Sequence, residues 1–109
     1  MPAESNLQSK ILNDIESWGA KSMVFKIMKC NINGVPDVFF TTVFSGPVFL
    51  ELKAPRKKPD PHQELIINKL RKCGVPAFSC DSWERWVEIK NELNLTKTNI
   101  ANAARLFKK

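Results

Sequence analysis

The fold is decided by residues 37–53, which read DVFFTTVFSGPVFLELK. Within them, residues 37–44 and 48–53 are rich in Val, Phe and Thr, a composition typical of β-strands. Ser45-Gly46-Pro47 lies between the two runs and predicts a turn, because Gly and Pro interrupt regular structure. We therefore expect two antiparallel strands joined by a short connection.

A third strand is predicted immediately upstream. Residues 23–32 are rich in Val, Phe, Ile and Met, and Asn33-Gly34 follows them. Both turn residues tolerate a positive φ, so this pair favours a two-residue hairpin into the strand at 37–44. The three strands would then form an antiparallel meander.

A helix is predicted before the first strand, because apolar side chains recur there at helical spacing. They are Leu7, Ile11, Ile15 and Trp18. Gly19 is a typical helix stop. With Pro2 at the first helical position, the helix would include Glu4, whose side chain would share the apolar face. A capping box from Ser5 to Gln8 would instead leave Glu4 outside. We favour the earlier start.

A second helix and a further strand are predicted downstream of the meander. Asp60 is a suitable N-cap, Pro61 suits the first helical position, and Gln63 suits the third. Gly74 predicts the end of this helix. Residues 75–80 then form a short apolar run that favours a strand.

The remaining residues predict a third helix and a basic tail. Asp81 and Glu84 match a helix cap, and residues 94–109 form a C-terminal basic helix or tail. The element order is thus α-β-β-β-α-β-α, with a mixed central sheet flanked by helices. This order predicts the α/β class and a single domain over residues 1–109, with its core at about 4–93.

The composition is that of a small basic protein. The 109 residues include 17 Lys and Arg against 11 Asp and Glu, a net charge of +6, and 43% are apolar, enough for one core. The longest apolar runs fall far short of the ~20 residues that cross a bilayer, and no signal-peptide core is visible. We expect no membrane partner and a cytoplasmic location, which would be the host cytoplasm for a viral or phage protein.

The cysteines and the cations give two further indications. Cys30, Cys73 and Cys80 are odd in number and form no Cys-x-x-Cys motif, which argues against a disulfide framework and a zinc ribbon, so we expect buried thiols. The cations gather at residues 56–58 and 69–72. Such clusters are the usual footprint of a polyanion, although solvated lysines alone give the same pattern.

The strand at 48–53 carries the candidate chemistry. Alternation places Glu51 and Lys53 on one of its faces, and Leu50 and Leu52 on the other. Asp37 opens the neighbouring strand, and the hairpin folds it back toward the Glu51 end. Two acids and one lysine should therefore converge.

Two half-buried carboxylates repel unless a cation neutralises them. Mg²⁺ prefers oxygen ligands and is commonly held by one or two carboxylates beside a substrate phosphate. Water activated at such a site can attack a phosphodiester, while Lys53 stabilises the developing charge or holds the nucleophile. Alternatively, Glu51 and Lys53 are only the solvated face of an edge strand, and Asp37 is a turn residue. The combination with Gln63 favours a site.

Four segments together resemble a known nuclease group. They are Gly34-Val35-Pro36-Asp37, Phe49-Leu50-Glu51-Leu52-Lys53-Ala54-Pro55, Gln63, and Gly74-Val75-Pro76. The combination is similar to that of the virus-type replication and repair nucleases (VRR-NUC) of the PD-(D/E)xK superfamily, over residues 4–84. The resemblance implies a restriction-endonuclease-like core, a site for Mg²⁺ or Mn²⁺, and cleavage of DNA.

The resemblance also implies roles for individual residues. Asp37, Glu51 and the Leu52 carbonyl would be metal ligands, Lys53 the catalytic lysine, and Gln63 a brace from the second helix. Glu4 matches the acid that family members carry on the first helix, and it would be a further ligand. Many members place an Arg and an Asn before the glycine-proline-aspartate motif, whereas this chain has Lys26 and a different local pattern.

The basic run Arg56-Lys57-Lys58 directly follows the strand with Glu51, between two prolines that would hold it extended. We expect it, with Lys26, to contact phosphates. The expected function is a DNA endonuclease of phage or DNA-repair type that acts on branched DNA, as Holliday-junction resolvases do. Two alternatives stay open: a nicking, homing or restriction-like nuclease on duplex DNA, and a non-catalytic nucleic-acid-binding module.

A homodimer is expected from an apparent surplus of apolar residues beyond the core. The residues are Trp83, Trp86, Ile100 and Phe107. Monomers rarely expose large contiguous apolar patches, so the surplus predicts an interface. Two-fold pairing would also allow two strands of a branched substrate to be cut. Alternatively, the third helix simply completes the core of the monomer.

Overall fold

The computed structural model describes residues 2–54, 60–93 and 95. The elements are α1 (Pro2–Glu16), the 3₁₀ helix η1 (Gly19–Lys21), β1 (Ser22–Lys26), β2 (Val38–Thr42), β3 (Gly46–Leu52), α2 (Pro61–Lys72), β4 (Ala77–Cys80) and α3 (Trp83–Glu92). The four strands form one sheet in the order β1-β2-β3-β4, in which β1, β2 and β3 are antiparallel and β4 is parallel to β3. The predicted element order and the mixed sheet are confirmed.

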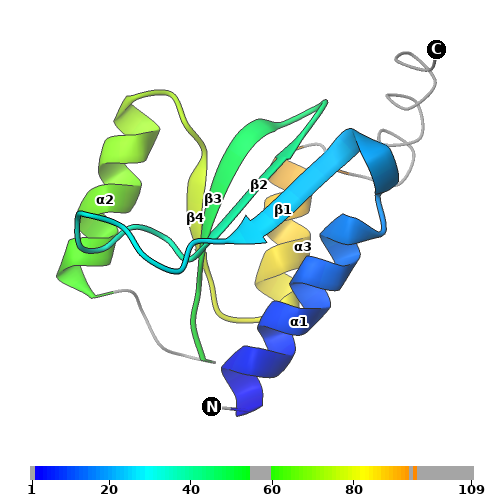
Figure 1. Ribbon diagram of the computed structural model, residues 1–109, viewed down its shortest axis with the longest axis horizontal. Helices are drawn as coiled ribbons and strands as arrows, with labels where there is room; N and C mark the ends of the chain where they lie inside the picture. Colours follow the sequence, from blue (N-terminus) through cyan, green and yellow to red (C-terminus); the bar gives the residue numbers. More distant parts are fainter. Residues whose placement is uncertain (1, 55–59, 94, 96–109) are drawn as a thin grey trace.

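The sheet lies between helices (Figure 1): α1 and α3 cover one face, and α2 stands on the other side, beside β4. The core fills the space between the sheet and the pair α1 and α3. Its most buried members include Ile11, Ile15, Val38, Phe40, Leu50, Trp86 and Ile89. Within the described residues, no helix is both long and apolar enough to span a membrane.

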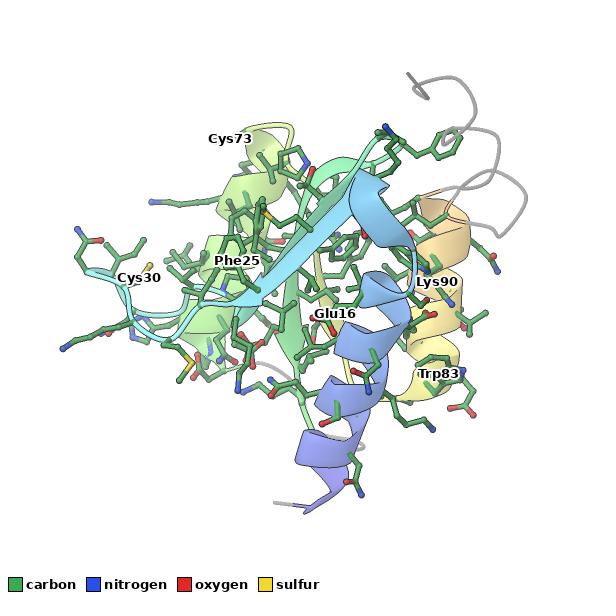
Figure 2. The ribbon with its side chains drawn as sticks, turned by 45° about the vertical axis from the view of Figure 1, so that its right-hand side comes forward. Glu16, Phe25, Cys30, Cys73, Trp83 and Lys90 are labelled. Carbon is green, nitrogen blue, oxygen red and sulfur yellow. The ribbon has the colours of Figure 1, made fainter. Side chains whose placement is uncertain are left out.

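Helices α1 and α3 are also joined by polar contacts. Asp14 Oδ2 on α1 accepts hydrogen bonds from Trp86 Nε1 at 2.8 Å and from Lys90 Nζ at 2.9 Å. Lys90 in turn lies 5.3 Å from the ring centroid of Trp83, about two turns back along α3 (Figure 2). A buried polar group is costly unless it is hydrogen-bonded, so these contacts select one arrangement of the two helices.

The earlier start of the first helix is confirmed, because α1 begins at Pro2 and its backbone includes Glu4. The cap of α2 is confirmed as well: the Asp60 side chain accepts from Gln63 N, and the Gln63 side chain accepts from Asp60 N. The predicted cap of α3 is wrong by one residue. Ser82, not Asp81, is the N-cap, and its hydroxyl accepts from Arg85 N at 3.1 Å.

The predicted hairpin at Asn33-Gly34 is wrong. Strand β1 ends at Lys26, and residues 27–37 form a loop that runs toward α2 (Figure 1). Gly34 has φ +89°, and a Cβ placed there would lie 2.6 Å from the His62 carbonyl oxygen. The loop is therefore pressed against the first turn of α2, and this tertiary contact overrides the local preference for a two-residue turn.

The expectation that Trp86 of the third helix belongs to an exposed dimer interface is also wrong. Trp86 is fully buried in the core, where it stacks on Trp18 at a centroid distance of 6.2 Å, and Trp83 is partly buried against the same cluster. Helix α3 thus completes the core of the protomer. Ile100, Phe107 and the predicted tail at 94–109 lie outside the described residues, apart from Leu95, which is buried.

The cysteines follow the prediction in part. All three are free thiols, and Cys80 is buried. Cys30 and Cys73 are exposed, which contradicts the expectation of buried thiols. Cys30 lies in the loop 27–37, and Cys73 follows the last residue of α2, where neither is covered by another layer.

Candidate active site

Strand β3 delivers Glu51 to the side of the sheet where α2 lies. Its alternate residues Val48, Leu50 and Leu52 belong to the core between the sheet and the pair α1 and α3, so Glu51 points the other way. Glu51 is nevertheless only 4% exposed. The Lys53 ammonium lies 3.4 Å from Glu51 Oε2 and partly compensates the cost of burying this carboxylate.

Asp37 reaches the same point from the start of β2. Val38 pairs with Leu50 in the antiparallel register, which puts Asp37 beside Glu51. Asp37 Oδ1 accepts a hydrogen bond from the backbone N–H of Leu52 at 3.1 Å. Its carboxylate is therefore fixed on the peptide group between Glu51 and Leu52.

Helix α2 supplies the fourth group. Gln63 is the third residue of this helix, and its Nε2 donates to Glu51 Oε2 at 2.9 Å. Its Oε1 accepts from Asp60 N at 3.1 Å, as one half of the capping box. The structure thus brings Asp37, Glu51, Lys53 and Gln63 together.

The donor set fits a hard divalent cation. Asp37 and Glu51 offer carboxylate oxygens from adjacent strands, and Mg²⁺ and Mn²⁺ prefer oxygen ligands. No group of three or more His, Cys, Asp and Glu residues that could hold a metal occurs within the part of the chain that the structure describes. A site here would accordingly rest on two carboxylates and leave coordination positions for water and substrate, as is common for Mg²⁺.

No protein-family model matches the sequence, and no curated protein matches it either. A solved structure described as "VRR_NUC domain" is similar to this chain, with a TM-score of 0.70 and 27% sequence identity. The match covers 83% of this chain and 95% of that one. The chain has a VRR-NUC-like fold. The similarity points to a nuclease-type domain.

For the other residues expected at the site, the structure describes the side chain of Lys26 only. Lys26 is the last residue of β1 and is exposed. The next residue, Ile27, donates its backbone N–H to the Asp37 carbonyl oxygen, so Lys26 lies near Asp37. Glu4 lies on α1, but its side chain is outside the described part of the chain. Residues 56–58 are outside it entirely.

One neighbour of the site is not among the residues expected from the sequence. Ser79 of β4 is the register partner of Glu51, which places the two on the same face of the sheet. This adjacency depends on the parallel register, for which the sequence carries no signal. Gly34, which belongs to the Gly-Val-Pro-Asp segment, lies against the first turn of α2 and not in a two-residue hairpin turn.

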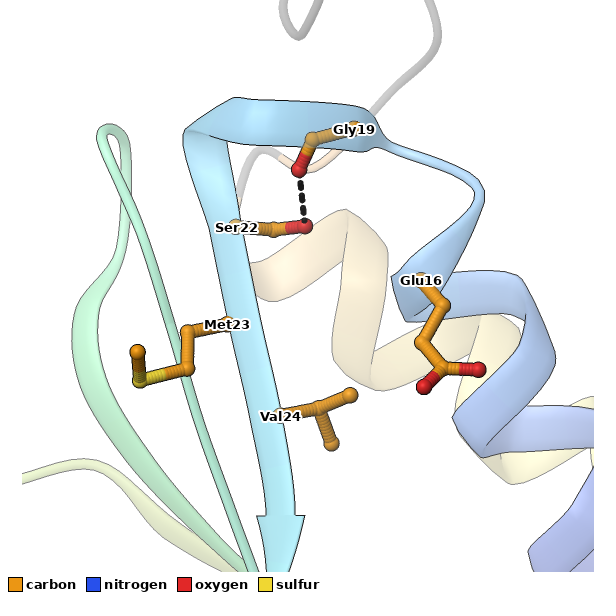
Figure 3. A pocket seen from close by; sticks show the side chains of 5 residues that line it. All are labelled: Glu16, Gly19, Ser22, Met23 and Val24. Atoms are coloured by element: carbon orange, nitrogen blue, oxygen red, sulfur yellow. Dashed lines mark hydrogen bonds between the residues drawn. The ribbon is translucent and has the colours of Figure 1, made fainter.

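A separate hollow of about 300 Å³ lies between the end of α1 and β1 (Figure 3). Glu16, Gly19, Ser22, Met23 and Val24 line it, and Ser22 Oγ donates to Gly19 O at 3.1 Å. Ser22 opens β1, whereas Asp37 lies beyond the other end of that strand, opposite Ile27. The hollow is therefore distinct from the candidate site of Asp37 and Glu51.

Proposed function

We propose that the protein is a divalent-metal-dependent DNA endonuclease that hydrolyses phosphodiester bonds. The observation that carries the proposal is the convergence of Asp37, Glu51, Lys53 and Gln63 in a nuclease-type fold. A merely solvated strand face does not account for Glu51, which is 4% exposed and is held by two side chains. The basic net charge of +6 is in keeping with a polyanionic substrate.

Asp37 and Glu51, with the Leu52 carbonyl as a further donor, would hold Mg²⁺ or Mn²⁺, and Glu4 is a candidate fourth ligand. When bound, the metal supplies charge stabilisation at the scissile phosphate and lowers the pKa of water. Lys53 is partly exposed beside Glu51, so its ammonium can approach a phosphate oxygen or orient the attacking water. The Leu52 N–H and the Gln63 amide hold the two carboxylates in position.

The finer proposal is structure-specific cleavage of branched DNA, similar to that of Holliday-junction resolvases, by a homodimer of phage or DNA-repair type in the cytoplasm. A compact domain that reads DNA mainly through phosphate contacts recognises shape better than base sequence. Two copies related by two-fold symmetry would supply one site for each strand.

The second candidate is a nuclease that nicks duplex DNA, of the homing or restriction-like kind. One observation favours it: Trp86 and Ile89 of α3 are buried within the protomer, so this helix does not offer the apolar surface from which a dimer was expected. A single small site can cut only one strand at a time. A non-catalytic nucleic-acid-binding module is disfavoured, because binding alone gives no reason to place two carboxylates together beside a polyanion.

The test is an assay of the purified protein on labelled linear, flap and four-way DNA with Mg²⁺, with Mn²⁺ and with chelator. We expect metal-dependent cleavage, fastest on branched DNA. Asp37→Ala, Glu51→Ala and Lys53→Ala should each lower the rate by about 100-fold or more while circular dichroism and DNA binding persist.

The matched control is Glu88→Ala, which removes an exposed carboxylate from α3 on the opposite side of the sheet. It should cleave at the wild-type rate. Cleavage that survives the chelator, or near-normal turnover by Glu51→Ala, would contradict the proposed site. Sedimentation equilibrium then separates the two candidates, because a protomer mass of 12.4 kDa together with cleavage of one strand would favour the nicking enzyme.

A further inference from the structure

The face of the sheet that carries the candidate site is only partly covered. Helix α2 packs mainly on β4, whereas β1 and β2 lie farther from it (Figure 1). On β1, Met23 is 60% exposed and Phe25 is 48% exposed. By contrast, the opposite face is closed by α1 and α3, and Val38 and Phe40 of β2 are fully buried there.

Three aromatic side chains cross this open face in one line. Phe25 pairs with Phe39, and Phe39 pairs with Phe49, so all three point to the same side of the sheet. Their ring centroids are 4.9 Å apart for Phe25 and Phe39, and 5.3 Å apart for Phe39 and Phe49. We name Phe25, Phe39 and Phe49 the aromatic row; Figure 2 shows where Phe25 lies on β1.

The aromatic row lies beside the candidate site, two residues farther along the same strands. Phe49 precedes Glu51 by two residues on β3, and Phe39 follows Asp37 by two residues. Residues two apart on a strand share a face and are separated by about 7 Å. A strand of DNA whose phosphate lies at Asp37 and Glu51 therefore has its adjoining nucleotides within reach of the row.

The charges around this face suit a polyanion. From residue 17 to residue 59, the acids are Asp37 and Glu51, both of which belong to the site. Among the described residues of the same stretch, the cations are Lys21, Lys26, Lys29 and Lys53. A second copy of this chain would bring the same positive charge to the face, whereas a nucleic-acid strand brings the opposite charge.

We propose that the aromatic row binds the bases of an unpaired DNA strand beside the cut. This proposal rests on the proposed function and names its substrate more closely: DNA with a single-stranded segment next to the scissile phosphate, such as a flap or a fork. Stacking on aromatic side chains needs bases whose faces are free, and bases inside a uniform duplex are already stacked. The contact is tolerant of sequence because every base has a π face.

The experiment measures fluorescence anisotropy of labelled single-stranded and duplex oligonucleotides in chelator, where cleavage does not occur. Phe25→Ala should weaken single-strand binding about 10-fold and leave duplex binding unchanged, because one base stack is lost. Phe25→Trp should bind the single strand at least as tightly as the wild type, and Phe25→Leu should behave as Phe25→Ala does.

The matched control is Phe44→Ala, which removes a 42% exposed Phe in the turn between β2 and β3, at the far end of the sheet from Glu51. It should bind both oligonucleotides as the wild type does. Equal single-strand affinity for Phe25→Ala and the wild type would overturn the proposal, as would an equal loss on duplex. Phe25 is half exposed, so its truncation leaves the core between the sheet and α1 intact, and circular dichroism verifies the fold.

Two further measurements distinguish base stacking from a contact between two copies of the chain and from a failure of the proposed function. If sedimentation equilibrium shows a wild-type dimer that Phe25→Ala converts to a monomer, the face is a contact between two copies and the base-stacking proposal is wrong. In Mg²⁺, Phe25→Ala should reduce cleavage of flap DNA relative to linear duplex. If the wild type cleaves neither DNA, the proposed function fails, while the binding measurement still decides the role of the row.

Discussion

Gln63 links the start of α2 to Glu51: its Nε2 donates to Glu51 Oε2 at 2.9 Å, and its Oε1 accepts from the Asp60 backbone at 3.1 Å. The same planar amide thus completes a helix cap and holds a carboxylate of the candidate site. Its orientation is fixed by the cap, because only the NH₂ group can donate to Glu51. The start of α2 and the position of the Glu51 carboxylate consequently both depend on the Gln63 side chain.

This double role predicts different results for two substitutions of Gln63. Gln63→Glu keeps an acceptor for the Asp60 N–H but sets a second carboxylate against Glu51, whereas Gln63→Ala only removes both contacts. We expect Gln63→Glu to lower the cleavage rate by about 10- to 100-fold, and more than Gln63→Ala does. Cleavage rates and urea unfolding of both variants provide the measurement.

The control for the cap alone is Asp60→Ala, which removes the acceptor of Gln63 N and leaves the Gln63 amide in place. It should cost about 1 kcal/mol of stability with a smaller effect on cleavage. Wild-type activity in Gln63→Glu would show that the contact with Glu51 has no part in the reaction.

Gly34 sets the distance between the loop 27–37 and α2. A Cβ there would lie 2.6 Å from the His62 carbonyl oxygen and 3.2 Å from Gln63 N, and the residue has φ +89°. We expect Gly34→Ala to destabilise the fold by about 2–4 kcal/mol and to displace Asp37 relative to Gln63, with a loss of cleavage. Thermal unfolding and cleavage of the folded fraction test this.

Gly74→Ala is the matched control, because Gly74 has φ +84° but a Cβ there would meet nothing within 4 Å. Gly74→Ala therefore measures the cost of a positive φ alone, about 1 kcal/mol, without any clash with α2. Equal effects of the two substitutions would mean that the close approach of Gly34 to His62 contributes nothing.

Local signals explain how much of this fold could be predicted. The two strands within residues 37–53 are predictable from their composition and the break between them. Their register is not: the turn lies at residues 43–45 and not at the predicted Ser45-Gly46-Pro47, and only this earlier turn sets Asp37 opposite Glu51. The start of α2 was predictable because Asp60, Pro61 and Gln63 each suit their position. These features depend on residues near each other in the sequence.

The errors concern residues whose environment is set from a distance. Asn33-Gly34 has the composition of a hairpin turn, but Gly34 is needed against His62 of α2. The burial of Trp86 could not be read from its helix alone, because it depends on which helices share the face with Phe40. For α3, Asp81 and Ser82 are both good N-caps, and neither composition nor spacing selects between them.

Cys80 predicts a dependence of stability on alkaline pH. Burial raises the pKa of the Cys80 thiol from 9.0 to about 11. Below pH 9 the Cys80 thiol is protonated in both the folded and the unfolded state, so it leaves the free energy of unfolding unchanged. Between pH 9 and pH 11 the thiol ionises in the unfolded state but stays protonated in the folded state. Stability should therefore fall over that window, by on the order of 2 kcal/mol from this thiol.

Urea unfolding at both ends of that window provides the measurement. Cys80→Ala should lose less stability than the wild type as the pH rises, although it starts lower because of the cavity. Cys73→Ala removes an exposed thiol and should follow the wild type. If Cys80→Ala and the wild type decline in parallel, the thiol is not the cause of the alkaline loss.

The two cationic clusters predict different contributions to DNA binding. In the sequence, residue 56 follows the end of β3 at Leu52 by four positions. Lys69 and Lys72, by contrast, are exposed near the other end of α2 from Gln63. Lys57→Ala with Lys58→Ala should therefore reduce the steepness of the log-log salt dependence on duplex DNA by about 2, because two phosphate contacts release their counterions. Lys69→Ala with Lys72→Ala changes the net charge equally and should leave the slope unchanged; Arg71 is kept because its Nε donates to Ala77 O. Titrations in chelator over a series of salt concentrations measure both slopes, and equal slopes for the two double variants would mean that only overall charge, and no specific contact by residues 57 and 58, governs binding.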